Sequence, residues 1–261
     1  MCRLAAYLGP AVPLAHTISD PEHSLVHQSY RPQEMTSGTV NVDGYGFAWW
    51  DRDRRAEPYL YRSTLPIWND NNLGSLGDYV VSDCMLANVR GATPGQSLGA
   101  DNTQPFSAGT LAAVHNGFVE DFRNTLQRKL RRALDESAYA SVAGSSDSET
   151  LIAYLFQHMR EAASPAEGMR AGLDTLLAMA PGVKMTLNFI VSDGEQLIAS
   201  RLASGVEAPS LYSLTDHPRF PRAVLIASEP LFDDDAWIAV PQGSLMSVDR
   251  KRSVTVDALA A

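Results

Sequence analysis

The chain begins with MCRLAAYLG (residues 1–9), which joins a cysteine at position 2 to an apolar stretch. Leu4, Ala6 and Leu8 recur at every second position, which predicts a short buried strand with these side chains on one face. If Met1 is removed, Cys2 carries a thiol and a free α-amine on one residue. The amine, with an unfolded pKa of about 8, can then exchange a proton with the nucleophilic thiol near neutral pH. Cys2 is therefore either an ordinary strand residue or a nucleophile at the start of a strand.

Composition and charge narrow the class of protein. The chain has 261 residues, of which 45% are hydrophobic, and this is enough for one large domain spanning residues 1–261. A net charge of −9 argues against nucleic acid or an anionic membrane surface as the main partner. No apolar run approaches the ~20 residues needed to span a bilayer, and the N-terminus lacks a signal-peptide pattern. We therefore expect a cytoplasmic protein.

The two cysteines, Cys2 and Cys84, give neither a disulfide framework nor a cysteine-based metal site. We expect no metal and no other cofactor. His23 and His27, four residues apart, are expected to pack against neighbours rather than bind a metal. The sequence leaves the oligomeric state open, a homo-oligomer included.

The order of expected elements is strands, then helices, then strands. Strands are expected at residues 2–9, 44–50, 58–63, 79–90, 110–117, 183–192, 195–201, 223–228, 243–249 and 253–259. Residues 10 to about 40 are expected to be irregular. Apolar residues at four-residue spacing from Phe118 to Leu134 predict a helix, and Ser146 and Ser164 each open a capping-box pattern that predicts another. This order predicts an α+β protein with two packed sheets and helices outside them.

Three motifs carry side chains suited to chemistry. His115-Asn116-Gly117 ends an apolar strand, and an asparagine amide beside a glycine N–H can offer two donors to a developing oxyanion. Arg90 follows another strand, and a guanidinium can hold a carboxylate through two parallel hydrogen bonds. Asp147, in a capping box, could face the ammonium group of a ligand. Taken singly, each also fits an ordinary structural role, such as a turn or the electrostatics of a helix start.

In chain order, these motifs resemble the class II glutamine amidotransferases, a family of N-terminal-nucleophile hydrolases. The matching stretches run from residue 2 to residue 231: Cys2-Arg3, Asp43 to Trp50, Arg90-Gly91-Ala92-Thr93, Gln104-Pro105-Phe106, His115-Asn116-Gly117, Ser146 to Glu149 and Ala227 to Leu231. The resemblance implies the four-layer αββα sandwich of N-terminal-nucleophile hydrolases over the whole chain.

The resemblance also implies a role for each matched residue. Cys2 would be the nucleophile, and its freed α-amine would shuttle the proton. Asn116 and Gly117 would form the oxyanion hole. Arg90, helped by Thr93, would hold the α-carboxylate of a glutamyl group, and Asp147 would hold its α-ammonium. His115 is expected to be structural, Cys84 to be an inert core thiol, and Glu229 to shape the wall of the site.

Three further stretches resemble the ergothioneine-pathway amidohydrolases of this family: residues 23–30 (HSLVHQSY), 66–68 (PIW) and 89–95 (VRGATPG). Leu4 and Gly91 depart from the histidine and serine common in that pattern. The resemblance implies an amidohydrolase that cleaves the linear γ-glutamyl amide of γ-glutamyl-hercynylcysteine sulfoxide, a small molecule, and releases glutamate and hercynylcysteine sulfoxide.

Two other functions stay open. About 30 residues follow residue 231, which is too few for a synthase domain. The first alternative is therefore a glutaminase subunit that delivers ammonia from glutamine to a separate synthase. The second is a protein that only binds γ-glutamyl metabolites.

The implied leaving group carries a trimethylammonium, which aromatic faces bind well. The candidates are Tyr30, Trp49, Trp50 and Trp68, each of which could equally be a core residue. Our hypothesis from the sequence is that Trp68 contacts the leaving group.

Overall fold

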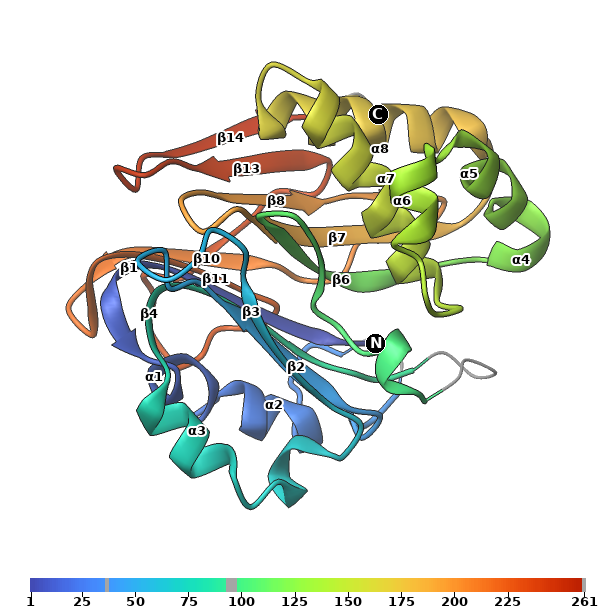
Figure 1. The fold of residues 1–261 in the computed structure, drawn as a ribbon. Helices are drawn as coiled ribbons and strands as arrows, with labels where there is room; N and C mark the ends of the chain where they lie inside the picture. The colour runs from blue at the N-terminus through green and yellow to red at the C-terminus, as the bar shows by residue number, and fades with distance from the viewer. Residues whose placement is uncertain (36–37, 93–97, 260–261) are drawn as a thin grey trace.

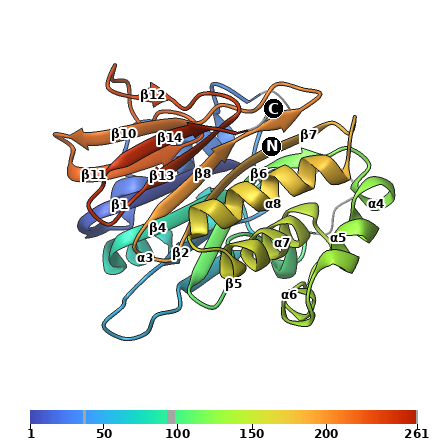
Figure 2. The same ribbon diagram turned by 90° about the horizontal axis from the view of Figure 1, so that it is seen from above.

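The computed structural model describes residues 1–35, 38–92 and 98–259. Two antiparallel sheets lie face to face, and helices cover the outer face of each sheet (Figures 1 and 2). The layers are therefore helix, sheet, sheet and helix, which confirms the predicted α+β class and the αββα sandwich.

Sheet A contains the strand that begins at the predicted nucleophile. Its order is β12-β10-β11-β1-β4-β2-β3. The bounds are β1 (Arg3–Pro13), β2 (Tyr45–Trp49), β3 (Tyr59–Ser63), β4 (Val81–Val89), β10 (Tyr212–His217), β11 (Phe220–Ala227) and β12 (Ile238–Ala239). β1 lies between β4 and β11, and Arg3 pairs with Val89 of β4. The predicted strand at 2–9 is thus central to its sheet.

Sheet B contains the strand of the Asn-Gly motif. Its order is β14-β13-β8-β7-β6-β5, and β9 pairs with β7. The bounds are β5 (Phe106–Ala108), β6 (Leu111–Val119), β7 (Met185–Ser192), β8 (Leu197–Arg201), β9 (Ala203–Ser204), β13 (Ser244–Val248) and β14 (Val254–Ala258). Ser192 pairs with Leu197 across the hairpin between β7 and β8. Gly194 in this hairpin has a φ of +89°, which a glycine adopts readily.

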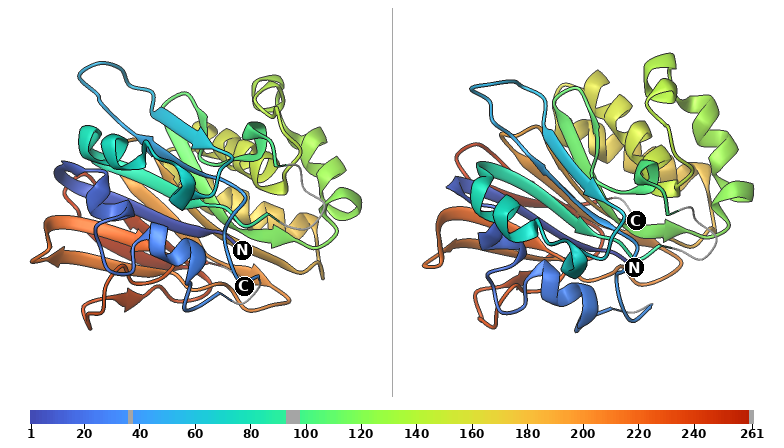
Figure 3. Two further views of the ribbon diagram at one scale, coloured as in Figure 1. Left: turned by 90° about the horizontal axis from the view of Figure 1, so that it is seen from below. Right: turned by 60° about the horizontal axis from the view of Figure 1, so that its bottom comes forward.

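The helices form two groups on opposite sides of the sheets (Figure 3). Those outside sheet A are α1 (Ala15–Ile18), α2 (Leu25–Tyr30) and α3 (Leu73–Tyr79), with the 3-10 turn η1 (Ile67–Asn69). Those outside sheet B are α4 (Phe122–Thr125), α5 (Gln127–Ala133), α6 (Glu136–Ala140), α7 (Asp147–Glu161) and α8 (Pro165–Met179). The 3-10 turn η2 (Ala100–Asn102) precedes β5.

Both predicted helix starts are confirmed. The Ser146 hydroxyl accepts a hydrogen bond from the Glu149 N–H at 3.2 Å, and Ser164 accepts one from Glu167 at 3.3 Å. These bonds satisfy N–H groups that have no partner inside the helix. The carboxylate of Glu149 does not return to Ser146 but accepts from the Ala143 and Gly144 N–H groups.

Two predictions of secondary structure were wrong. Residues 10–40 are not wholly irregular, because β1 continues to Pro13 and α1 and α2 follow it. The predicted helix from Phe118 to Leu134 is not continuous, because Phe118 belongs to β6 and pairs with Thr186. Asp121, with a φ of 45°, then precedes α4, and Leu126, with a φ of −120°, separates α4 from α5. The four-residue spacing reflects burial against sheet B rather than one helix.

Three hydrophobic clusters fill the spaces between the four layers. One lies between sheet B and its helices, one between sheet A and its helices, and one between the two sheets. Leu4, Ala6 and Leu8 belong to the cluster between the sheets, as their alternation predicted. Cys2 continues this face of β1, so the strand aims the thiol into the space between the sheets.

Candidate active site

Cys2 lies directly before β1 and is 9% exposed. Because Arg3 pairs with Val89, continuing the two strands by one residue brings Cys2 opposite Arg90. The backbone N–H of Arg90 donates to the Gly44 carbonyl at 2.8 Å, and its guanidinium Nη1 donates to the Asp43 carbonyl at 3.4 Å. The structure therefore brings the predicted nucleophile and the predicted carboxylate-binding residue together at one end of sheet A.

Asn116 lies on β6 and is fully buried. Its side chain shares a face with Ala112 and Val114, which pack between the sheets, and β6 contacts both β1 and β4 there. Neither Oδ1 nor Nδ2 of Asn116 has a hydrogen-bond partner within the described parts of the chain. A buried amide left without a partner costs ~1–3 kcal/mol, so this group calls for an explanation such as a bound ligand or water.

Gly117 follows on the same strand and must be a glycine. A Cβ at this position would lie 1.9 Å from the Thr186 carbonyl oxygen and 2.3 Å from His115 Nε2. The N–H of Leu187, its partner in β7, donates to Leu202, so the Gly117–Leu187 pair exchanges no ladder bonds. The Gly117 N–H therefore points away from β7, on the strand edge that it shares with His115.

Asp147 is the first residue of α7 and contacts that edge of β6. Its Oδ2 accepts a hydrogen bond from the Val119 N–H at 3.2 Å, and its Oδ1 accepts from Ser148 at 2.9 Å. Asp147 is 5% exposed. The carboxylate is thus placed two residues along β6 from Gly117. Thr93, the remaining predicted binding residue, lies outside the described residues.

His115 ties β6 to α7 rather than facing the space between the sheets. Its Nδ1 lies 2.9 Å from Ser148 Oγ, and its Nε2 lies 3.1 Å from the Thr186 carbonyl oxygen. Burial lowers the pKa of His115, and the nearby charge of Asp147 opposes that shift only in part. A neutral ring then donates from Nε2 to Thr186 and accepts at Nδ1 from Ser148. These contacts fit the predicted structural role.

Met1 occupies the space beside Gly91. A Cβ on Gly91 would lie 3.1 Å from the Met1 carbonyl oxygen and 2.9 Å from Asn41 Oδ1. Asn41 is fully buried, and its Oδ1 has no hydrogen-bond partner among the described residues. Sequence reasoning missed Asn41, because a loop asparagine two residues before the matched stretch at Asp43 carries no signal of its own.

Glu229 anchors the other face of β1. Its Oε1 lies 3.2 Å from Arg3 Nε, and its Oε2 lies 2.7 Å from His23 Nε2. The backbone N–H groups of Gln33 and Glu34 donate to the same carboxylate at 2.8 and 3.1 Å. Burial raises the pKa of Glu229, but the hydrogen bonds and the charge of Arg3 outweigh it and lower the pKa overall. This network ties the start of β1 to the loop after β11 and to the segment after α2. That Glu229 shapes the wall of the site stays a prediction.

Comparisons with known proteins show the family of the chain. The sequence profile of the class-II glutamine amidotransferases matches residues 18–259. The chain is also 32% identical, over 99% of its length and 97% of the relative's, to a protein of Mycobacterium tuberculosis named gamma-glutamyl-hercynylcysteine sulfoxide hydrolase. The chain belongs to the class II glutamine amidotransferase family. The predicted family and the prediction of an amidohydrolase-type enzyme are confirmed.

A further relative and two solved structures are also similar to the chain. A probable glutamine amidotransferase of Saccharomyces cerevisiae is 27% identical over 96% of this chain and 82% of its own length. A glutamine aminotransferase class-II domain protein from Silicibacter pomeroyi superposes with a TM-score of 0.71 at 25% identity, and each chain is fully covered. Glutamine phosphoribosylpyrophosphate amidotransferase from B. subtilis superposes at 0.68 with 18% identity, over 99% of this chain and 49% of that one. The last comparison shows the shared fold alone.

The aromatic candidates for binding the leaving group have different surroundings. Trp50 is buried, and its Nε1 donates to Thr110, while Trp49 stacks on Tyr59. Trp49 pairs with Met85, four residues along β4 from Val89, so both tryptophans lie roughly 14 Å from the Cys2 end of the sheet. Trp68 is 39% exposed and packs edge-on against Tyr30.

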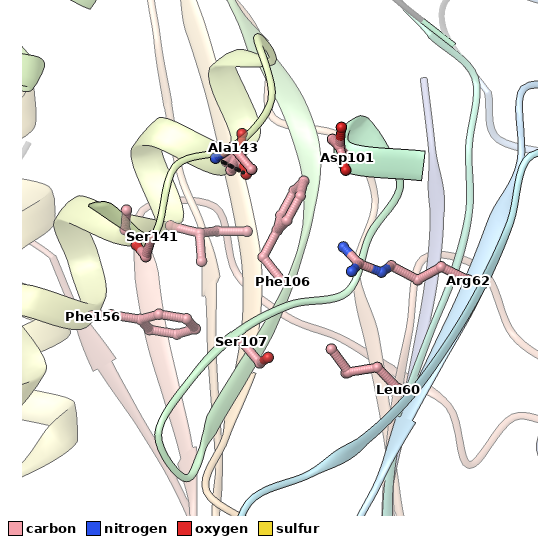
Figure 4. Close-up of a pocket in the computed structure, with 11 residues that line it drawn as sticks. Leu60, Arg62, Asp101, Phe106, Ser107, Ser141, Ala143 and Phe156 are labelled. Carbon is pink, nitrogen blue, oxygen red and sulfur yellow. Dashed lines mark hydrogen bonds between the residues drawn. The ribbon is translucent and has the colours of Figure 1, made fainter. Parts of the chain in front are cut away.

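Two other features lie outside the candidate active site. Cys84 is fully buried, and burial raises the pKa of its thiol to about 12, as expected for an inert core thiol. A small cavity of about 150 Å³ lies beside β3, β5 and α7, and the side chain of Arg62 points into it toward Phe106 and Asp101 (Figure 4). Its walls contain none of the predicted catalytic residues.

The described residues contain no group of three or more side chains suited to hold a metal ion. In the same ranges, no helix is long and apolar enough to cross a membrane.

Proposed function

We propose that residues 1–261 act as one catalytic domain that hydrolyses the γ-glutamyl amide of γ-glutamyl-hercynylcysteine sulfoxide, releasing glutamate and hercynylcysteine sulfoxide. The observation that carries this proposal is the buried, unpartnered amide of Asn116, next to Gly117 and across the core from β1, the strand that follows Cys2. The name of the Mycobacterium tuberculosis relative supports the choice of substrate.

The nucleophile is formed when Met1 is removed. The Met1 carbonyl oxygen and Asn41 Oδ1 both lie beside Gly91. Removal of Met1 would open this space and free the α-amine of Cys2 close to Asn41. The unpartnered Oδ1 of Asn41 is an acceptor for that amine and would hold it beside the thiol. The thiol proton passes to the amine, and the thiolate attacks the γ-carbonyl carbon of the substrate.

The oxyanion then develops on the carbonyl oxygen. The Asn116 amide and the Gly117 N–H are donors on adjacent residues and would bind this oxygen in the transition state. The α-ammonium of Cys2 gives its proton to the leaving nitrogen, the C–N bond breaks, and a γ-glutamyl thioester remains on Cys2. Water, deprotonated by the same amine, attacks the thioester and releases glutamate with the free thiol.

The glutamyl group has a carboxylate and an ammonium at the end away from the amide. Arg90 is suited to the carboxylate, because its guanidinium presents two parallel N–H donors. Asp147 is suited to the ammonium, because its carboxylate is held at the edge of β6 near the oxyanion donors. We include Thr93 as a second ligand of the carboxylate. No cofactor takes part in this scheme.

A glutaminase subunit that supplies ammonia to a separate synthase is the second candidate. The Saccharomyces cerevisiae relative, named as a probable glutamine amidotransferase, favours it. Both candidates share the nucleophile, the oxyanion hole and the glutamyl-binding residues, and they differ in the amine that leaves.

One experiment separates the two candidates. Intact mass of the purified protein shows whether Met1 has been removed, and glutamate release is then followed with γ-glutamyl-hercynylcysteine sulfoxide and with glutamine. We expect the Met1-free protein to cleave the conjugate with a much higher kcat/KM. A preference for glutamine would identify an ammonia donor instead. Met1-free protein that binds these compounds but releases no glutamate from either would contradict both and identify a binding protein.

A further inference from the structure

A cavity of about 700 Å³ lies on the other side of Asn116 from Asp147. Its walls come from residues 33–35 after α2, from Arg201 of β8, from residues 207–212 at the start of β10, and from Ala239. Neither the sequence motifs nor the roles proposed above involve this cavity. Three contacts show that it adjoins the catalytic residues.

The first contact runs to the oxyanion residue. The Asn188 amide Nδ2 donates to the carbonyl of Pro209, which lines the cavity, at 2.9 Å. Asn188 pairs with Asn116 across β6 and β7. Asp147 contacts β6 at the opposite edge, through the Val119 N–H. Consider a substrate with its glutamyl ammonium at Asp147 and its scissile amide at Asn116. Its leaving amine, on the far side of the amide from the glutamyl group, then points toward the cavity.

The other two contacts run to the N-terminus of the chain. Ser210 of the cavity wall donates to the carbonyl of Ser228, and Ser228 binds both the N–H and the carbonyl of Leu4, two residues from Cys2. Met35 of the opposite wall accepts from Asn41 at 3.8 Å, beside Met1. Two opposite walls of the cavity are thus connected to the start of β1, one through Ser210 and the other through Met35.

The lining of the cavity is acidic and contains one aromatic ring. Two carboxylates, Glu34 and Glu207, and one guanidinium, Arg201, are present among its described residues. Arg201 is held in the wall, because it donates to the carbonyls of Pro209 at 2.9 Å and Val240 at 2.8 Å. The Tyr212 hydroxyl donates to Glu34 Oε1 at 2.8 Å.

The hydrogen bond between Tyr212 and Glu34 persists near neutral pH. Burial and the hydrogen bond to Glu34 raise the pKa of Tyr212 to about 12, so its hydroxyl remains a donor. Glu34 is also held through its backbone, because its N–H donates to the Glu229 carboxylate. An aromatic face beside an anchored carboxylate suits a cation that carries methyl groups and cannot donate hydrogen bonds.

We propose that this cavity is the leaving-group subsite, and that Glu34 and Tyr212 select an amine bearing a quaternary ammonium. This inference rests on the proposed γ-glutamyl hydrolase function and adds the part of the site that determines specificity. It assigns the ammonium to Tyr212 and Glu34 rather than to Trp68, which does not line this cavity.

The test uses two γ-glutamyl amides of the same shape. One has 2-(trimethylammonio)ethylamine as the leaving group, and the other has 3,3-dimethylbutylamine, in which carbon replaces the charged nitrogen. We expect the Met1-free enzyme to cleave the cationic amide with a kcat/KM about tenfold higher, through a lower KM.

Three variants localise this preference. Glu34→Gln keeps an acceptor for Tyr212 but removes the charge, and Tyr212→Leu removes the ring. Each should raise KM for the cationic amide about tenfold and should change KM for the neutral amide much less. Tyr212→Phe keeps the ring and should retain most of the preference. Glu57→Gln, an exposed carboxylate beyond the Trp49 end of β2, is the matched control and should change nothing.

The outcomes separate this inference from the proposed function. If both amides are cleaved and Glu34→Gln and Tyr212→Leu leave the preference intact, the subsite is wrong and the hydrolase stands. If Met1-free enzyme cleaves neither amide nor the conjugate, the hydrolase is wrong. The leaving-group role then falls with it, and calorimetric binding of 2-(trimethylammonio)ethylamine tests the cation site alone. Weaker binding to Glu34→Gln than to wild type supports an ammonium site at Glu34, and equal or absent binding overturns that site as well.

Discussion

Arg3 and Glu229 form a buried ion pair in which Nε and Oε1 are 3.2 Å apart, on the face of β1 opposite to Cys2. Both side chains are almost completely excluded from solvent. Burial lowers the pKa of Arg3, and the charge of Glu229 works against that shift. The pair joins the nucleophile strand to the loop after β11 and, through Gln33 and Glu34, to the segment that lines the proposed leaving-group subsite.

We expect Glu229→Gln to destabilise the protein strongly at neutral pH. The change leaves the Arg3 charge buried without compensation, which costs ~3–5 kcal/mol of unfolding free energy. Because the folded state lowers the pKa of Glu229, its contribution is complete above the ordinary carboxyl pKa and is lost as pH falls through the lowered value. Denaturant unfolding at several pH values should show the difference between variant and wild type narrowing below about pH 4.

The matched control is Glu22→Gln, which makes the same change in an exposed ion pair with Arg219. An exposed ion pair contributes little to the free energy of unfolding, so the unfolding midpoint of Glu22→Gln should differ little from that of wild type. Equal effects of the two substitutions, or a difference for Glu229→Gln that does not depend on pH, would show that the buried pair does not stabilise the fold in this way.

Much of the fold follows from local pattern, and the errors have a common cause. The alternation of Leu4, Ala6 and Leu8 correctly predicts which face of β1 packs between the two sheets. It does so because successive side chains of a strand point to opposite sides of the sheet, so every second one packs against the same layer. The spacing from Phe118 to Leu134 fails, because one apolar stripe can cover a sheet from a strand end and two short helices in succession. Periodicity reports burial and does not report where the backbone changes direction.

In the candidate site, too, some residues belong to local motifs and others are brought together only by the fold. Cys2, Asn116 and Gly117 belong to short motifs, so the sequence alone singles them out as candidates. Glu34 and Tyr212 are 178 positions apart, and only the pairing of β10 with β11 beside β1 brings them together. Contacts that depend on strand order have no local signature, so the proposed leaving-group subsite could not be read from the sequence.

Asn116→Asp should lower kcat by about 10²–10³ with little change in KM. The replacement has nearly the same shape, but its carboxylate accepts hydrogen bonds and cannot donate one to the oxyanion. Steady-state kinetics with the preferred γ-glutamyl amide measure the effect, and Asn116→Ala should give a loss of the same order. Full activity in Asn116→Ala would remove the amide from the oxyanion hole.

Arg90→Lys should raise KM for γ-glutamyl substrates by at least about tenfold, because an ammonium cannot reproduce two parallel hydrogen bonds to a carboxylate. A substrate analogue without the α-carboxylate gives a sharper readout, since its cleavage should be nearly insensitive to the change. Arg54→Lys, an exposed arginine near the tip of the β2–β3 connection, serves as the control. A KM like that of wild type would place the carboxylate site elsewhere.

Asn41→Ala should lower kcat and leave substrate binding largely intact. The proposed role of its Oδ1 is to hold the freed α-amine of Cys2 beside the thiol, so its loss disorders the group that moves the proton. The pH profile of kcat/KM distinguishes this role from a structural one, because the limb that reports the amine should shift in the variant. An unchanged profile together with reduced thermal stability would indicate packing alone.

Alkylation should distinguish the two cysteines. Cys84 is fully buried, and its thiol pKa is raised to about 12, so it has almost no thiolate at pH 7 and no path to solvent. Cys2 lies at the proposed substrate site, and its amine favours formation of the thiolate. Brief treatment of folded, Met1-free protein with iodoacetamide should therefore add one carbamidomethyl group, at Cys2, and abolish glutamate release.

Protein that retains Met1 should react more slowly, because its acylated nitrogen cannot act as the base. Cys84→Ala should behave as wild type in both assays, whereas Cys2→Ala should lose turnover yet still bind substrate through Arg90 and Asp147. Labelling at Cys84 with retained activity would contradict the assignment of the nucleophile.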